Sequence, residues 1–209
     1  MKQDLLDATN RYYSEKLRIH GTTPKGVDWN DAESQVKRFV QLAGVFREER
    51  SFSLNDIGCG YGALLDFLEP RRFDVDYRGY DISNDMIEAA RSRHPARSKA
   101  MFFSGSCPKE AAHYSIASGI FNVKGDTDDS DWLAHLHHTL DEMDRYSTRG
   151  FSFNCLSSYS DAHRRRADLY YADPLALFDR CMTRYSRNAR LLHDYGLYEF
   201  TLLVNKANR

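Results

Sequence analysis

Three glycines at alternate positions, preceded by a carboxylate, form the stretch of this sequence best suited to hold a ligand. Asp56 is followed by Gly58, Gly60 and Gly62, in the pattern Asp-x-Gly-x-Gly-x-Gly. Glycine lets the backbone turn sharply and approach a ligand with no Cβ atom in the way. A carboxylate in front of the first glycine can accept hydrogen bonds from a ligand that carries an ammonium group. The pattern therefore predicts a cofactor-binding loop.

A second carboxylate stands at a matching distance along the chain. Asp81 follows Gly62 by 19 residues and ends a run that reads as a strand. This is the spacing at which a βαβ unit places an acidic side chain against ribose hydroxyls. Ile82 and Met86 come directly after Asp81 and are expected to line the same site. The two carboxylates together predict a site for a nucleoside.

Two kinds of cofactor fit the glycine loop. The spacing Gly58-x-Gly60-x-x-Ala63 also matches the dinucleotide fingerprint, which binds a pyrophosphate at the start of a helix and would make the chain an NAD(P)-binding oxidoreductase. The acidic residue before the first glycine favours a ligand with an ammonium group instead. With that acid, the stretch resembles the first motif of the class I (Rossmann-like) S-adenosylmethionine-dependent methyltransferases.

This resemblance carries expectations about the cofactor. In that family the glycine loop passes beneath the methionine part of S-adenosyl-L-methionine, and the product is S-adenosyl-L-homocysteine. The segments at 118–123, 153–156, 170–174 and 193–200 also look like those of a group of small bacterial methyltransferases. The resemblance names no substrate for that group.

The strands that would position these residues can be placed from the apolar pattern. We expect strands near 52–57, 75–82, 100–106, 114–123, 150–159, 189–195 and 197–204, with helices near 63–68, 84–90, 128–146 and 174–182. By resemblance, they form an α/β fold with a seven-stranded, mostly parallel sheet of order 3-2-1-4-5-7-6. The last strand is antiparallel and helices cover both faces.

Two further helices are expected before the first strand. The apolar spacing predicts them at 4–20 and 31–47, with Asp31 as the cap of the second. We expect residues 1–209 to form one methyltransferase domain, in which 1–48 are a helical lid and 49–209 a Rossmann-like core. By resemblance, Gln35 and Arg38 of the second helix hold the cofactor's carboxylate, together with Trp29.

The ends of the third and fourth strands supply the remaining cofactor candidates. By resemblance, the loop after the third strand borders the adenine, which assigns Gly105 and Ser106 to that part of the site. Many members of the family have an acid there, and this chain has none. The fourth strand lies beside the first at the point where strand order reverses, so Ser118 and Gly119 are expected to border the sulfonium and the substrate.

The sequence does not identify a catalytic base. Methyl transfer from a sulfonium needs the acceptor held close to the methyl group with water excluded, and a base only if the acceptor arrives protonated. Weak candidates in segments expected to surround the mouth of the site are His20, Tyr159, His163 and His193.

Three histidines share the helix expected at 128–146. His135 and His138 are spaced to face one side of that helix, but no acid or thiol with matching spacing completes a metal site. We therefore interpret these histidines, with His137, as part of a solvated face and expect no metal.

Composition narrows the choice of partners. The chain has 209 residues, 28% of them charged, and a net charge of -1. No global basicity points to nucleic acid, and no apolar run reaches the roughly 18 to 20 residues of a membrane span. Four separated cysteines, with no Cys-x-x-Cys motif and no apolar leader, are typical of a cytoplasmic protein.

These observations favour a cytoplasmic methyltransferase that acts on oxygen or nitrogen of a small-molecule acceptor, with no statement possible on oligomeric state. A tRNA or protein methyltransferase is an alternative, although it would ordinarily show a basic face or an Asn/Asp-Pro-Pro-Tyr-type motif on the fourth strand. A third alternative is a subunit that binds the cofactor and activates a partner without catalysing transfer itself.

Overall fold

A twisted β-sheet organises the computed structural model, which describes residues 3–29, 31–46, 49–95 and 99–206. In this part of the chain the sheet has seven strands in the order β3-β2-β1-β4-β5-β7-β6. The first five are parallel, and β7 is antiparallel to both of its neighbours. The strands are β1 (Ser51–Ile57), β2 (Asp74–Asp81), β3 (Ala100–Ser104), β4 (Ala112–Ala117), β5 (Ser147–Leu156), β6 (Ala189–Leu192) and β7 (Glu199–Asn205). The predicted fold class is confirmed.

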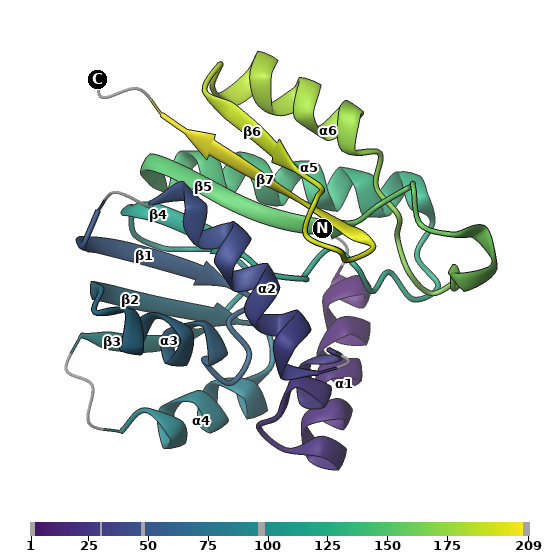
Figure 1. Cartoon of the computed structure of the whole chain (residues 1–209). Coiled ribbons are helices and arrows are strands. Elements are labelled where there is room, and N and C mark those ends of the chain that lie inside the picture. Colours follow the sequence, from purple (N-terminus) through teal and green to yellow (C-terminus); the bar gives the residue numbers. More distant parts are fainter. Residues whose placement is uncertain (1–2, 30, 47–48, 96–98, 207–209) are drawn as a thin grey trace.

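Helices cover both faces of the sheet. Figure 1 shows α2 and α3 in front of it and α5 behind it, while α1 lies beside the carboxyl ends of β1 and β2. Side chains of Asp31, Ser83 and Asp173 cap α2, α4 and α6 by accepting hydrogen bonds from backbone N–H groups of the first turn. The α-helices are α1 (Gln3–His20), α2 (Ala32–Leu42), α3 (Ala63–Leu68), α4 (Asn84–Arg93), α5 (Asp129–Arg145) and α6 (Pro174–Arg180).

The fourth strand is shorter than its apolar run predicts. β4 ends at Ala117, and the residues up to Val123 form turns. Gly119 has a φ of 76°, and the Asn122 N–H donates to its carbonyl at 3.3 Å, so the chain leaves the sheet there. Phe121 remains fully buried in this loop. A buried loop side chain therefore gave the same apolar signal as a strand.

Other predicted boundaries also shift. α2 ends at Leu42 and passes into a short 3-10 turn, earlier than the predicted end of that helix. β5 begins and ends three residues earlier than predicted. The closing hairpin is more open than predicted, because β6 ends at Leu192 and β7 starts only at Glu199.

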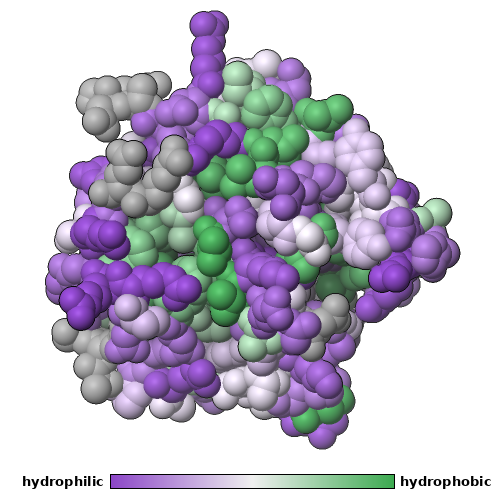
Figure 2. Space-filling view, in the orientation of Figure 1, coloured by the Kyte–Doolittle hydropathy of each residue, from purple (hydrophilic) through white to green (hydrophobic). Residues whose placement is uncertain are grey.

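The sheet divides the apolar core into two layers. One layer includes Phe39, Leu64 and Ile87 from α2, α3 and α4, and the other includes Leu136 and Leu177 from α5 and α6. Figure 2 shows a largely hydrophilic outer face in this view, with hydrophobic patches between the polar side chains. None of the helices described is long and apolar enough to span a membrane.

Candidate functional site

The glycine loop leaves β1 as a tight, left-handed turn. Backbone N–H groups of Gly58 and Cys59 both donate to the carbonyl of Tyr80 on β2, at 2.8 and 3.0 Å. Gly58, Gly60 and Gly62 have φ angles of 71°, 53° and 83°, a region that side chains with a Cβ disfavour. The alternate glycines therefore match the backbone that the turn adopts before α3 begins.

The three glycines have different surroundings. A Cβ on Gly58 would overlap the side chain of Ile120, and a Cβ on Gly60 would lie 3.0 Å from Val27. A Cβ on Gly62 would instead lie 2.8 Å from Nε2 of His94, at the end of α4. Gly62 thus allows α4 to pack against the loop, and it does not line the pocket described below.

Asp81 ends β2 and faces the glycine loop. One carboxylate oxygen accepts from the Gly60 N–H and the other from the Ser83 N–H, each at 2.9 Å. Burial raises the pKa of Asp81, and these backbone bonds act against that rise. Each carboxylate oxygen can accept more than one hydrogen bond, so both can still receive a ligand hydroxyl.

Asp56 lies deeper, at the end of β1. Its side chain is 2% exposed and accepts a hydrogen bond from the Tyr77 hydroxyl at 2.5 Å. Burial, with a smaller contribution from the nearby Asp81, raises the pKa of Asp56 to about 7, against the lowering effect of that hydrogen bond. A cationic ligand beside this carboxyl would favour its ionised form.

Both carboxylates open onto one pocket at the carboxyl ends of the parallel strands. The pocket is closed on one side by α1, which contributes Leu6, Thr9 and Tyr13. Most of the predicted cofactor residues line it, namely Trp29, Gln35, Asp56, Gly58, Gly60, Asp81, Ile82, Met86, Gly105, Ser106, Ser118 and Gly119. Gly62 and Arg38 are the two predicted residues that do not.

Arg38 is held in a buried ion pair instead. Its Nε and Nη2 atoms donate to the two carboxylate oxygens of Glu199 on β7, at 2.8 and 2.7 Å. Arg38 is 6% exposed and Glu199 2% exposed, while Nη1 of Arg38 is buried without a hydrogen-bond partner. The charge that was expected to hold a ligand carboxylate is therefore already balanced by the protein.

The same ion pair is part of a closed ring of contacts, which we call the lid ring. Arg38 stacks under the indole of Trp29, with 3.8 Å between Cζ and the ring centroid. The indole covers Gly119, where a Cβ atom would overlap it. The Gly119 N–H donates to Oδ1 of Asn154 at 2.9 Å, and Nδ2 of Asn154 donates to Glu199 at 2.5 Å. The lid ring thus joins α2 and the turn before it to β5, β7 and the loop after β4.

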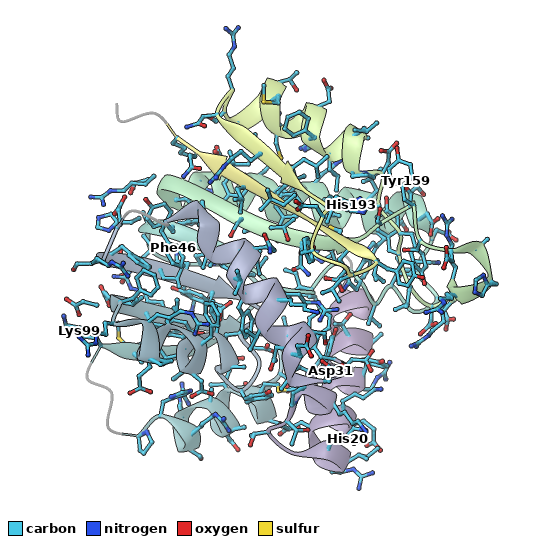
Figure 3. The ribbon with its side chains drawn as sticks, in the orientation of Figure 1. His20, Asp31, Phe46, Lys99, Tyr159 and His193 are labelled. Carbon is cyan, nitrogen blue, oxygen red and sulfur yellow. The ribbon has the colours of Figure 1, made fainter. Side chains whose placement is uncertain are left out.

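The four candidate bases lie elsewhere. Figure 3 shows His20 at the foot of α1, and His193 beside Tyr159. The rings of the latter two are 6.0 Å apart, and His163 lies exposed in a short turn at 162–164. None of the four lines the pocket. A base among them would have to be brought to the acceptor by a rearrangement that this structure does not contain.

Helix α5 supplies a wall that the sequence interpretation missed. Trp132, His135 and Thr139 line the pocket from one stripe of this helix. His135 is only partly exposed, in contrast to the solvated face predicted for it, whereas His138 is exposed. Burial, with a contribution from His138, lowers the pKa of His135 to about 4. The sequence did contain a signal for this wall: Trp132, His135 and Thr139 are spaced i, i+3 and i+7, which puts all three on one side of a helix.

A metal centre has no support among the described residues. They contain no group of three or more His, Cys, Asp or Glu side chains placed to hold a metal ion.

Comparisons with known proteins place the chain among methyltransferases. A family model described as "Methyltransferase domain" matches residues 55–142. "Putative methyltransferase Rv1506c" of Mycobacterium tuberculosis (strain ATCC 25618 / H37Rv) is 57% identical over 157 residues, which is 75% of this chain and 95% of the relative.

Solved structures share the fold at low sequence identity. The chain superposes on the "DhpI-SAH complex structure" with a TM-score of 0.66 and 12% identity, over 100% of both chains. It also superposes on the N-methyltransferase NodS from Bradyrhizobium japonicum WM9, in complex with S-adenosyl-L-homocysteine, with a TM-score of 0.66 and 15% identity. That match covers 95% of this chain and 98% of NodS.

Proposed function

The chain belongs to the class I S-adenosylmethionine-dependent methyltransferase family, and we propose that it methylates oxygen or nitrogen of a small-molecule acceptor. Family membership follows from the match to Rv1506c, which is 57% identical to this chain over an alignment that covers 95% of Rv1506c. The resemblance predicted from the glycine loop is thereby confirmed, and S-adenosylmethionine is the cofactor of this family.

One observation carries the assignment of the site: Asp56, Asp81 and the backbone of the glycine loop face the same pocket. In the proposal, Asp81 accepts hydrogen bonds from the ribose hydroxyls, since both of its oxygens keep acceptor capacity. The carboxylate of Asp56 attracts the ammonium group of the cofactor's methionine part. The glycines leave the floor of the pocket without side chains, so that the cofactor can lie close to the backbone. The residues present therefore fit the cofactor.

When bound, the cofactor would supply a methyl group activated by its sulfonium: an acceptor atom would bond to that carbon in line, and the C–S bond would break to release S-adenosylhomocysteine. The contribution of the protein is then to align the acceptor and to exclude water. Trp29 and Tyr13 line the pocket from the lid side, and Trp132 lines it from α5. Aromatic walls of this kind can hold a cation by its contact with their faces.

Within this proposal, residues 1–48 act as the lid of a core at 49–209, in one domain. A small acceptor is favoured because α1 lies across the pocket mouth, with Leu6, Thr9 and Tyr13 in its lining. The low net charge of -1 gives no general attraction for nucleic acid. We place the reaction in the cytoplasm, because all four cysteines are free thiols.

Calorimetry tests the cofactor assignment. Purified protein is titrated with S-adenosylhomocysteine, S-adenosylmethionine, NAD+ and NADP+. We expect saturable binding of the first two with one site per chain, and no heat of binding from the nicotinamide nucleotides. Binding of NAD+ without binding of S-adenosylhomocysteine would overturn the assignment.

The acceptor class is tested with methyl-labelled cofactor. An extract of the source cells is separated into metabolites below 3 kDa, total tRNA and protein, and each fraction is incubated with the enzyme and labelled S-adenosylmethionine. We expect enzyme-dependent label in the metabolite fraction. Label confined to tRNA or protein would show a macromolecular acceptor, and no label in any fraction would favour the non-catalytic subunit.

A further inference from the structure

Two buried polar atoms in the pocket have no hydrogen-bond partner. They are Nδ1 of His135 on α5 and Oγ of Ser118 in the loop after β4. Both residues line the pocket that holds Asp56 and Asp81. A buried polar group without a hydrogen-bond partner destabilises the folded protein, so such groups mark places where a partner is missing.

The Nδ1 atom of His135 belongs to the wall that α5 contributes to the pocket. The proposed function puts the ribose at Asp81 and the methionine chain over the glycine loop. We then expect the base against lining residues outside those two parts, among them Ile82, Ser106 and His135.

We propose that His135 recognises the adenine ring, with Nδ1 accepting a hydrogen bond from the exocyclic amine. This inference rests on the proposed function, and it deepens that function by naming the residue that reads the base. Gly105 and Ser106, the residues of the loop after β3 that line the pocket, carry no acid to receive the amine, and in the proposal His135 of α5 receives it instead.

The protonation state of His135 allows Nδ1 to accept a hydrogen bond. A pKa of about 4 keeps its imidazole neutral at physiological pH, so one ring nitrogen remains an acceptor. The proton then sits on Nε2. The Trp132 ring supports the imidazole edge-on, at 5.3 Å between centroids and 67° between planes. Because Nδ1 makes no bond within the protein, a ligand can engage it without breaking one.

Calorimetric titration with S-adenosylhomocysteine compares four proteins. His135→Phe keeps a flat ring but removes both nitrogens, and we expect about tenfold weaker binding, the size of one hydrogen bond. His135→Asn places an amide oxygen near the position of Nδ1 and should recover most of that loss. His138→Ala, one turn along α5 and outside the pocket, is the matched control and should bind as the parent does.

A second readout does not depend on affinity. In protein labelled with 15N-histidine, the Nδ1 resonance of His135, assigned from its absence in His135→Phe, should move when S-adenosylhomocysteine saturates the site. Parent-like binding by His135→Phe, or an unmoved Nδ1 resonance at saturation, would overturn the inference and leave the proposed function intact. Failure of the parent itself to bind S-adenosylhomocysteine would instead contradict the proposed function.

Discussion

The floor of the pocket and the lid ring above it are built in opposite ways. By the floor we mean Asp56, Gly58, Gly60 and Asp81, which line the pocket at the ends of β1 and β2. Within it, the Gly60 N–H donates a hydrogen bond to Asp81, 21 residues further along the sequence. The lid ring depends on Arg38 and Glu199, which are 161 residues apart. The floor holds a bare backbone and carboxylates open to the pocket, whereas the polar groups of the lid ring mostly satisfy one another.

This difference separates recognition from scaffolding. A ligand cannot take the place of Arg38 or Glu199 without leaving the other charge buried alone, so this ion pair is a poor binding surface and a strong brace, although Trp29 and Gly119 of the same ring line the pocket. The carboxylate oxygens of the floor can still accept hydrogen bonds from a ligand. Their burial disfavours the ionised forms of Asp56 and Asp81, as their raised pKa values show, and so lowers the stability of the folded protein. Variants in the two regions should therefore affect different measurements.

The largest effect is expected from breaking the lid ring. Glu199→Ala leaves the guanidinium of Arg38 buried without its counter-charge, and we expect a loss of about 3–5 kcal/mol in the free energy of unfolding. Urea denaturation measures it. Arg38→Met in the same chain removes the orphaned charge and should restore a large part of the loss. A double variant no more stable than Glu199→Ala would show that the ion pair is not the brace described.

A change in the floor should act on binding instead. Gly60→Val places a branched side chain at a φ of 53°, with its Cβ 3.0 Å from Val27 and in the pocket lining. We expect at least 100-fold weaker binding of S-adenosylhomocysteine by calorimetry. Gly125→Val is the matched control, because Gly125 has a φ of 57° and no atom within 4 Å of its Cβ position. Equal loss of binding in both variants would assign the effect to backbone strain.

The floor was readable from the sequence because its residues follow one another in a βαβ unit. Alternate glycines can only be explained by a special backbone, and strand spacing then places Asp81 opposite them. Asp56, Gly58, Gly60 and Asp81 line the pocket for this reason. The other eight predicted residues that line it come from the segment before β1 and from the residues that follow β2, β3 and β4. Gly62 was placed there too, although its missing Cβ makes room for His94.

The lid ring could not be read in this way. The sequence shows Arg38 as a basic residue on a helix, and nothing local indicates that β7 brings Glu199 beneath it. His135 was missed for a similar reason, because no acid or thiol completes a metal site with His138, and the three histidines were therefore interpreted as a solvated face. Which flank of α5 faces the pocket depends on how that helix packs on β4 and β5, and that is decided by contacts distant in sequence.

Removal of the Asp81 carboxylate should have a smaller effect on binding than blocking the floor. Asp81→Ala loses the acceptor for the ribose and releases the N–H groups of Gly60 and Ser83. We expect at least tenfold weaker binding of S-adenosylhomocysteine, with the cooperative unfolding transition retained. Calorimetry and circular dichroism on the same sample measure both quantities. Parent-like affinity in a folded variant would remove Asp81 from the site.

The smallest effect is a pH dependence that also distinguishes the two regions. The folded protein raises the pKa of Asp56 from 3.8 to about 7, so it holds this proton more tightly than the unfolded chain does. The resulting contribution to stability is present below pH 4 and is lost as the pH rises to about 7. Asp56→Asn removes this loss and keeps an oxygen for the Tyr77 hydroxyl.

A shift of about three pKa units corresponds to roughly 4 kcal/mol, and burial of the Asn amide N–H2 offsets about 3 kcal/mol of it. We therefore expect Asp56→Asn to be more stable than the parent at pH 8 by about 1 kcal/mol, and to lose that advantage at pH 4 to 5. Urea denaturation at the two pH values measures the difference. The same variant should bind S-adenosylhomocysteine more weakly at pH 8, because it lacks the charge that faces the ammonium group. If Asp56→Asn raises the free energy of unfolding and weakens binding of S-adenosylhomocysteine, then the buried carboxylate destabilises the fold and is needed for binding. A variant that is less stable at pH 8 would instead assign Asp56 to the scaffold, alongside the lid ring.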